Sequence, residues 1–414
     1  MNLRRFTERL IEFETTDGQE AAAAAWFRSR LSELGFETYE WLADAELLAD
    51  HPSFPDDPAA IEVADRPSVA GVLEVGDADA GPTLVLNGHL DVVPADEDAW
   101  SSPPFEAVWD ESDSGETLTA RGAVDMKGPL AACVFAALDA ADDAEEAGLD
   151  GRLIVEAVVG EEEGGIGAAA AALSNPYPFE RDAALVAEPT ELQAVTATEG
   201  TVMKRLEIQG RAAHAASRWV GEDVLPHFET IRTALLELEG ERTASISHPL
   251  YQEFPIPAPV CFGTVTAGNW ASSVPSSLTA EIRIGVVPGE TVDEVEAQFE
   301  ARFGEVVEES EWLSEHVPAF ERFSIQFEPA ETDAEERVVR DLQRAMGETG
   351  IDDTEPRGAT YGADSRHYVA AGIPTVVFGP GSIEQAHFPD ETVHWDQVEQ
   401  ARETIAETAR NFLA

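Results

Sequence analysis

The order of apolar and polar residues in the first half of the chain predicts an α/β sheet. Apolar runs at 83–86, at 153–159 and in the stretch DAALVAE (182–188) are separated by segments of helical character at 129–148 and 167–173. Continuous apolar runs are typical of strands buried on both faces, and alternation with helices indicates a sheet covered by helices. Two helices are predicted within residues 4–35, whereas residues 43–67, rich in Asp, Pro and Ala, are predicted to be irregular.

The pattern changes near residue 198. Residues 201–209 alternate like a half-exposed strand, followed by a helix at 223–238, strands at 262–267 and 278–287, and a helix at 291–303. This β-α-β-β-α order predicts a small α+β domain inserted into a larger one. A helix at 333–346, the apolar strand PTVVFG and a helix at 396–412 then return to the first pattern. We therefore predict a discontinuous large domain, residues 1–198 and 310–414, and an inserted domain, residues 199–309.

Charge and cysteine content limit the classes of function. The chain has 81 Asp and Glu against 26 Lys and Arg, a formal net charge of −55, which is the wrong sign for a nucleic-acid partner. Because such a charge repels itself, we expect the protein to work in concentrated salt, as in a halophilic cytoplasm. We see no membrane-spanning segment and no signal peptide, so a cytoplasmic protein is expected. Cys133 and Cys261 form no CxxC pair, so any metal would be held by His, Asp or Glu.

Five places carry acidic or histidine side chains directly after an apolar run or within a short turn of one. They are His89 with Asp91 in NGHLDVVP, Asp125 in RGAVDMKGP, Glu161, Glu162 and Glu163 in VVGEEEGGIG, Glu188 in ALVAEPT, and His387 in FGPGSIEQAHFPDE. Taken singly, each of these places also has an ordinary structural explanation: a histidine at a strand end, an aspartate in a turn, or a solvent-exposed run of charges. Together, at the edge where α/β folds place their sites, they suit two Zn²⁺ ions that share a bridging carboxylate.

These motifs, together with GRAAHAA (210–216), resemble those of the M20 family of metallopeptidases and deacylases, in the same order along nearly the whole chain. The resemblance implies a di-zinc catalytic domain with helices on both faces of a mixed sheet. It also implies an inserted ferredoxin-like domain that acts as a lid and forms a homodimer. The expected cofactors are two Zn²⁺ ions, with Co²⁺ or Mn²⁺ as substitutes, and the expected substrate is a small N-acyl amino acid or a short peptide.

The resemblance assigns roles to the motif residues. His89 and Glu188 would bind one zinc ion, and Asp91 would orient His89 from behind. Asp125 would bridge both ions and would be followed by a cis peptide bond. His387 would bind the second ion together with one glutamate of the cluster at 161–163.

The glutamate cluster leaves two registers open. The family pattern is Asp-Glu-Glu, one further residue and then glycines. Laid on this sequence, it makes Glu161 the general base and Glu162 the ligand, with Gly160 in place of the Asp. Shifted by one residue, it makes Glu162 the base and Glu163 the ligand. We favour the first register, because GGIGA then aligns better with the family's glycines.

Other residues match positions near the substrate in the family. His214 would stabilise the oxyanion, from the neighbouring subunit, and Arg283 would meet a substrate carboxylate. Ser272 stands where many relatives have Asn, and Asn269, three residues earlier, is an alternative contact. Further residues expected in the pocket wall are Asp364, Arg366, Gly379 and Gly381.

The implied reaction is hydrolysis of an amide bond, in which Glu161 moves a proton from water to the leaving amine. The motifs and composition favour the acetylornithine deacetylase and succinyl-diaminopimelate desuccinylase branch. A dipeptidase or carboxypeptidase would use the same site and stays open as an alternative. A metal-poor binding homologue is the alternative from another class, although every expected ligand is present.

Overall fold

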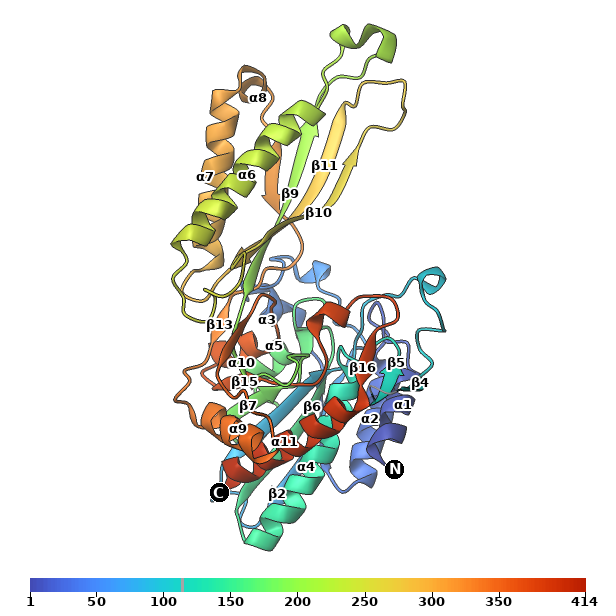
Figure 1. Cartoon of the computed structure of the whole chain (residues 1–414), viewed down its shortest axis with the longest axis vertical. Helices are drawn as coiled ribbons and strands as arrows, with labels where there is room; N and C mark the ends of the chain where they lie inside the picture. Colours follow the sequence, from blue (N-terminus) through green and yellow to red (C-terminus); the bar gives the residue numbers. More distant parts are fainter. Residues whose placement is uncertain (113–114) are drawn as a thin grey trace.

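In the computed structural model, which describes residues 1–112 and 115–414, a larger body carries both termini and a smaller body projects from it (Figure 1). The larger body is built on a nine-stranded sheet in the order β1-β2-β6-β3-β7-β15-β8-β13, with β14 paired to β8. Its strands are β1 (Glu37–Trp41), β2 (Ser68–Val75), β3 (Thr83–His89), β6 (Gly151–Val158), β7 (Ala183–Val186), β8 (Val195–Thr198), β13 (Ala330–Glu331), β14 (Arg357–Ala359) and β15 (Thr375–Val377).

The sheet is mixed. β3 runs parallel to β6 and β7, and β7 runs parallel to β15, so these four strands end at one edge of the sheet. β2 is antiparallel to β1 and β6, and β13 is antiparallel to β8. Every residue of β3 and β6 is buried, including Glu156 within the otherwise apolar run of β6, which confirms the runs at 83–86 and 153–159 as central strands.

Helices cover both faces of this sheet, as predicted. One face packs against α1 (Leu3–Ile11), α2 (Ala21–Glu33), α4 (Lys127–Ala147), α9 (Arg337–Glu348) and α11 (Trp395–Leu413), with Leu84 and Leu86 of β3 in the shared core. The opposite face, with Val85 and Ile154, packs against α5 (Ile166–Leu173) and α10 (Ser365–Ala370). The predicted helices at 129–148, 167–173, 333–346 and 396–412 are confirmed as α4, α5, α9 and α11.

The smaller body has the order β9 (Gly200–Gln209), α6 (Leu225–Ser245), β10 (Val260–Ala267), β11 (Ser277–Val286), α7 (Val292–Glu309), α8 (Glu311–Glu315) and β12 (Ala319–Arg322). Its four strands form a second sheet in the order β10-β11-β9-β12. The helices pack on this sheet around a core that includes Leu206, Ile231, Ile282 and Phe299. This β-α-β-β-α-β topology is ferredoxin-like, and we call the body the lid.

The structure differs from the sequence prediction in several places. The lid takes its fourth strand from β12, which lies beyond the expected boundary at residue 309. Helices α6 and α7 continue past Gly240 and Gly304, just after the positions where we ended them, because both glycines face open space and interrupt no packing. The segment 43–67 contains two short helical pieces, α3 (Ala45–Ala49) and η1 (Pro58–Ala60).

A third, three-stranded sheet was not predicted. It consists of β16 (Thr392–His394), β5 (Gly115–Thr119) and β4 (Val108–Ser112). Three further short 3₁₀ segments complete the described elements: η2 (Glu97–Ala99), η3 (Ala215–Val220) and η4 (Ile383–Gln385). Among the helices that the structure describes, none has the length and apolar character needed to cross a membrane.

Candidate metal centre and active site

The predicted ligands lie together because the parallel strands end at one edge. His89 is the last residue of β3, the glutamate cluster follows β6, and Glu188 follows β7. Asp125 lies just before α4, and the Asp125–Met126 peptide bond is cis, as the family resemblance implied. His387 lies in the loop after β15.

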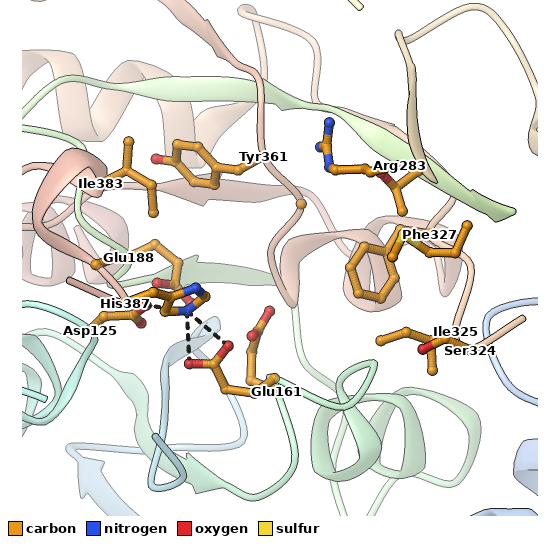
Figure 2. Close-up of a pocket in the computed structure, with 15 residues that line it drawn as sticks. Asp125, Glu161, Glu188, Arg283, Ser324, Ile325, Phe327, Tyr361, Ile383 and His387 are labelled. Atoms are coloured by element: carbon orange, nitrogen blue, oxygen red, sulfur yellow. Dashed lines mark hydrogen bonds and ion pairs between the residues drawn. The ribbon is translucent and has the colours of Figure 1, made fainter. Parts of the chain in front are cut away.

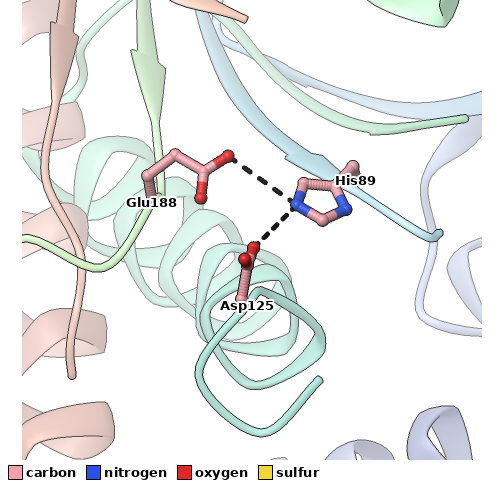
Figure 3. Close-up of side chains that lie close together, drawn as sticks. All are labelled: His89, Asp125 and Glu188. Atoms are coloured by element: carbon pink, nitrogen blue, oxygen red, sulfur yellow. Dashed lines mark hydrogen bonds and ion pairs between the residues drawn. The ribbon is translucent and has the colours of Figure 1, made fainter. Parts of the chain in front are cut away.

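One group of potential ligands contains His89, Asp125 and Glu188 (Figure 3). The Nε2 atom of His89 lies 3.0 Å from Oδ1 of Asp125 and 3.7 Å from Oε1 of Glu188. All three side chains are buried. One atom from each lies within 4.8 Å of the others, close enough to share one ion.

A second group contains Asp125, Glu162 and His387. The Nε2 atom of His387 lies 3.1 Å from Oε2 of Glu162 and 3.5 Å from Oδ2 of Asp125. The two carboxylate oxygens of Asp125 therefore approach different histidines, Oδ1 that of the first group and Oδ2 that of the second. The His387 side chain is 54% exposed, so the second group opens to solvent.

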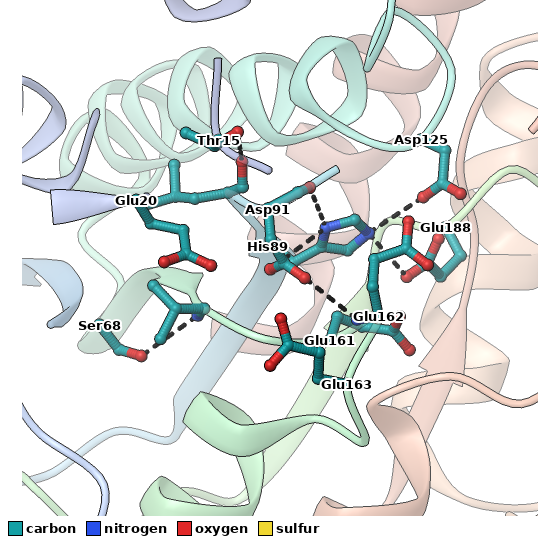
Figure 4. Close-up of polar contacts among 12 residues, drawn as sticks. Thr15, Glu20, Ser68, His89, Asp91, Asp125, Glu161, Glu162, Glu163 and Glu188 are labelled. Atoms are coloured by element: carbon teal, nitrogen blue, oxygen red, sulfur yellow. Dashed lines mark hydrogen bonds and ion pairs between the residues drawn. The ribbon is translucent and has the colours of Figure 1, made fainter. Parts of the chain in front are cut away.

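Asp91 lies behind His89 but contacts it differently from the expectation. Nδ1 of His89 hydrogen-bonds to the backbone carbonyl oxygen of Asp91 at 2.9 Å, whereas the nearest Asp91 carboxylate oxygen is 3.7 Å away. The other carboxylate oxygen accepts a hydrogen bond from the backbone N–H of Glu162 at 3.0 Å (Figure 4). Asp91 thus joins the end of β3 to the turn that carries the glutamates.

The three consecutive glutamates have different surroundings. Glu162 belongs to the second ligand group, whereas Glu161 belongs to neither group and lines the adjacent cavity. Glu163 points elsewhere, with its carboxylate 2.6 Å from the guanidinium of Arg66. Arg66 is buried and also pairs with buried Glu20 at 2.6 Å.

The crowded charges shift the pKa values of the cluster. Burial disfavours charged His89, but its hydrogen bond to Asp125 and the nearby carboxylates raise its pKa well above the usual value. Hydrogen bonds to Asp125 and Glu162 raise the pKa of His387 to about 10. Burial and the charge of Asp125 raise the pKa values of Glu162 and Glu188. The cluster therefore retains protons because its carboxylates lack sufficient positive charge.

Divalent cations would supply that charge. Each group offers one imidazole nitrogen and two carboxylate oxygens, donors that Zn²⁺ accepts, and both groups share Asp125. The residues present therefore fit a centre for two metal ions. Such a centre can activate water and polarise a carbonyl group.

Glu391 lies behind Asp125 and was not identified from the sequence motifs. Its buried carboxylate accepts hydrogen bonds from the backbone N–H groups of Gly122, Val124 and Asp125, at 3.0, 2.7 and 3.0 Å. Arg121 also donates to it, at 2.8 Å. Glu391 thereby fixes the turn that presents Asp125 to both histidines.

A cavity of about 590 Å³ lies beside the two ligand groups. Figure 2 shows His387 and the acidic side chains on one side of it and Arg283 of the lid on the other. Most of the remaining lining was not predicted, although alternation along β9 could have paired Thr201 with Met203 on one face. The other lining residues are Ser324, Ile325, Phe327, Tyr361, Gly362, Ile383 and Ala386.

Of the expected wall residues, Arg283 lines this cavity, whereas Arg366, Gly379 and Gly381 do not. Arg366 is buried behind Phe327, with its guanidinium 4.0 Å from the ring centroid, and its Nη1 lies 4.0 Å from Glu161. Gly379 packs against backbone, because an added Cβ would meet the carbonyl oxygens of Ala187 and Glu188 at 2.5 Å. An added Cβ on Gly381 would meet Val124, and Asp364, also expected in the wall, is buried outside the lining.

The predicted lid residues lie together but outside the cavity of their own chain. His214 is exposed, and its Nδ1 accepts a hydrogen bond from the backbone N–H of Ala216 at 3.1 Å. The carbonyl oxygen of Ser272 accepts from Ala215 N–H at 2.9 Å, which places the Ser272 segment beside the His214 segment. Asn269 is exposed on the same connection between β10 and β11.

The fold is a mixed α/β domain with an inserted ferredoxin-like domain, and its sheet edge carries two candidate metal-ligand groups that share Asp125. The sequence profile of peptidase family M20/M25/M40 matches residues 85–411, and the chain belongs to this family. Its family and its relatives show that it is a metal-dependent amidohydrolase.

Two curated relatives illustrate the range of activities. The acetylornithine deacetylase of Proteus mirabilis is 28% identical over 338 residues, which cover 80% of this chain and 79% of the relative. The N-formyl-4-amino-5-aminomethyl-2-methylpyrimidine deformylase of Halalkalibacterium halodurans is 25% identical over 358 residues, covering 82% and 81%.

Solved structures confirm the fold over the whole chain. The M20 metallo-carboxypeptidase Sso-CP2 of Sulfolobus solfataricus has a TM-score of 0.74 at 16% identity, covering 100% of this chain and 99% of its own. The dipeptidase Dug1p of Saccharomyces cerevisiae has a TM-score of 0.74 at 15% identity, covering 99% and 95%. A dinuclear metal-binding M20 peptidase of Bacillus subtilis has a TM-score of 0.62 at 15% identity, covering 99% and 97%.

Proposed function

We propose that the protein is a two-zinc hydrolase that cleaves the amide bond of an N-acyl amino acid. The observation that carries this proposal is the position of Asp125 between two histidine-containing groups, with Glu161 beside them in the same cavity. His89 and Glu188 would hold one ion, and Glu162 and His387 the other, with Asp125 shared. When bound, the ions would activate water and polarise the substrate carbonyl.

Glu161 is the proposed general base. It belongs to neither ligand group, and Glu163 is engaged with Arg66, which supports the register that makes Glu162 the ligand. Burial and the charge of Asp364 raise the pKa of Glu161 well above its usual value, as a group that both accepts and returns a proton requires. Glu161 would take a proton from the attacking water and deliver it to the leaving amine.

We propose that the active unit is a homodimer formed through the lid, in which His214 acts on the partner's substrate. Two features support this: His214 lies outside the cavity of its own chain, and β10 is an edge strand of the lid sheet with most of its side chains exposed. Such an edge can pair with a second copy.

We also propose that the protein works in the cytoplasm of a cell with a high salt concentration.

The test combines metal analysis with an activity assay in concentrated potassium chloride. We expect two equivalents of zinc per chain, hydrolysis of at least one N-acetyl amino acid, and loss of turnover in Glu161→Gln with the zinc retained. Cleavage of dipeptides alone would place the protein with the dipeptidases. Absence of both bound zinc and turnover would favour a binding homologue and contradict the proposal.

A further inference from the structure

The charged groups of the cavity occupy its two ends. Four carboxylates, those of Asp125, Glu161, Glu162 and Glu188, lie at the ligand end. Two divalent cations would engage the carboxylates of Asp125, Glu162 and Glu188, and the proposed base Glu161 would engage the attacking water. None of the four is therefore offered to a cationic side chain of a substrate. Away from the ligand end, the charged side chain in the described lining is Arg283, which is positive.

Arg283 is held in place from behind. Its Nη2 donates to Oε2 of Glu199 and to the carbonyl oxygen of Thr360, both at 3.2 Å. Glu199 is buried, is not among the cavity-lining residues, and is already paired with the guanidinium. Its carboxylate is therefore not offered to a substrate.

The wall near Arg283 is mostly apolar, and its polar members, Thr201 and Ser324, are uncharged. Figure 2 shows Phe327 and Ile325 on the side of the cavity that carries Arg283, and Met203 is the cross-strand neighbour of Arg283. The Tyr361 hydroxyl donates its proton to the carbonyl oxygen of Pro189 at 3.0 Å, so this proton is already engaged within the protein. Among the lining residues that the structure describes, no carboxylate lies outside the ligand end.

An ammonium group buried against this wall would lose its water without gaining an anionic partner, and Arg283 would repel it. An apolar side chain would instead remove apolar surface from water. We infer that the substrate is an N-acyl amino acid with an uncharged, apolar side chain, whose carboxylate meets Arg283 and whose side chain contacts Met203, Ile325 and Phe327. This inference rests on the proposed function and separates the protein from relatives that act on acetylornithine.

A matched substrate pair tests the inference. N-acetylnorvaline and N-acetylornithine have the same carbon chain and differ only in the terminal amino group. We expect kcat/KM of the zinc-loaded protein to be at least about tenfold higher for N-acetylnorvaline. Equal values, or a preference for N-acetylornithine, would overturn the inference and leave the amide-hydrolase proposal intact.

The same assay distinguishes failure of the underlying function. If neither acetyl compound reacts, the comparison is repeated with glycylnorvaline and glycylornithine, and the same preference is expected. If the zinc-loaded protein cleaves none of the four, the inference fails. If it also hydrolyses no other N-acetyl amino acid, the proposed function fails with it.

A paired substitution tests the wall itself. Ile325 is half-buried, so Ile325→Glu adds a carboxylate to the cavity without entering the core. We expect Ile325→Glu to lower the norvaline-to-ornithine ratio of kcat/KM at least fivefold, on the order of what one new charge contact supplies. Ile325→Gln, of the same size but uncharged, is expected to lower it less than twofold. Identical ratios in the two variants, with unchanged zinc content and Tm, would overturn the assignment of this wall to the side chain.

Discussion

The carboxylate of Glu391 is hydrogen-bonded to the backbone N–H of Asp125, at 3.0 Å, and holds the proposed bridging ligand in place. We expect Glu391→Ala to weaken metal binding about 10- to 100-fold, as loss of an outer-shell partner of a metal ligand typically does. A competition titration with a chelator measures the change. Exposed Glu403→Ala on α11 removes the same charge elsewhere and is expected to leave the affinity unchanged. Equal affinities in both variants would contradict a positioning role.

Substitution of each of the three glutamates after β6 should have a different effect on metal content and turnover. Glu161→Gln is expected to keep both metal ions and lose about 10²- to 10⁴-fold in kcat. Glu162→Gln should lose one equivalent of metal, because it removes a ligand oxygen from the second group. Glu163→Gln weakens only a partly exposed ion pair with Arg66 and should keep the metal and most turnover.

Metal analysis and single-turnover kinetics measure these three effects together. Loss of metal in Glu163→Gln, with loss of turnover but normal metal in Glu162→Gln, would instead establish the other register.

Subunit mixing tests the role of His214. His214→Ala and Glu161→Gln are each expected to be nearly inactive, the former by about 10²- to 10³-fold if it removes an oxyanion partner. If His214 acts across the dimer, co-refolding the two variants in equal amounts restores about a quarter of wild-type activity, because half of the dimers are mixed and each has one complete site. No recovery, in dimers shown to have exchanged, would place His214 outside the partner's site.

Glu199 should make stability depend on pH. Burial raises its pKa to about 8, although the charge and hydrogen bond of Arg283 oppose the shift. The folded protein then binds a proton that the unfolded chain releases near its usual pKa of 4.5, so unfolding free energy falls as pH rises from about 4.5 to 8. Glu199→Gln should flatten this slope and be more stable than wild type at pH 9.

Urea denaturation across pH measures the Glu199 effect, with exposed Glu207→Gln as the matched control. A Glu199→Gln slope equal to that of wild type would contradict the expectation.

Salt should stabilise the protein strongly. The net charge is −55, and the Debye length falls from about 10 Å at 0.1 M to about 3 Å at 1 M salt, which weakens the repulsion between surface carboxylates. We expect Tm to rise steadily with potassium chloride concentration and to rise much less in sucrose of equal osmolality. A Tm that responds equally to both would show that screening is not the cause.

The sequence predicted the central strands and long helices because their apolar periodicity is strong. It missed β2, in which Gly71 and Glu74 interrupt an otherwise apolar run. It also missed the short strands β8 and β14, which pair with each other and whose pairing is decided by tertiary contacts. Glu391 could not be identified either, since its role depends on a turn about 270 residues earlier in the chain.

The ligand candidates could be predicted because each follows an apolar run that reaches one sheet edge. The side chains that surround these ligands could not be predicted. The sequence gives no reason for Arg366 to lie behind Phe327, because the direction of a side chain at the start of a short helix depends on packing.

The wall residues Ile325 and Phe327 belong to the connection between β12 and β13, outside every strand that carries a proposed ligand. Changes in this connection can alter the shape and polarity of the cavity while the strand ends stay as they are. Selectivity can therefore diverge between descendants of one ancestor while the hydrolytic chemistry is inherited intact. For that reason, likeness at the metal-binding motifs is a weak guide to which compound such a protein consumes.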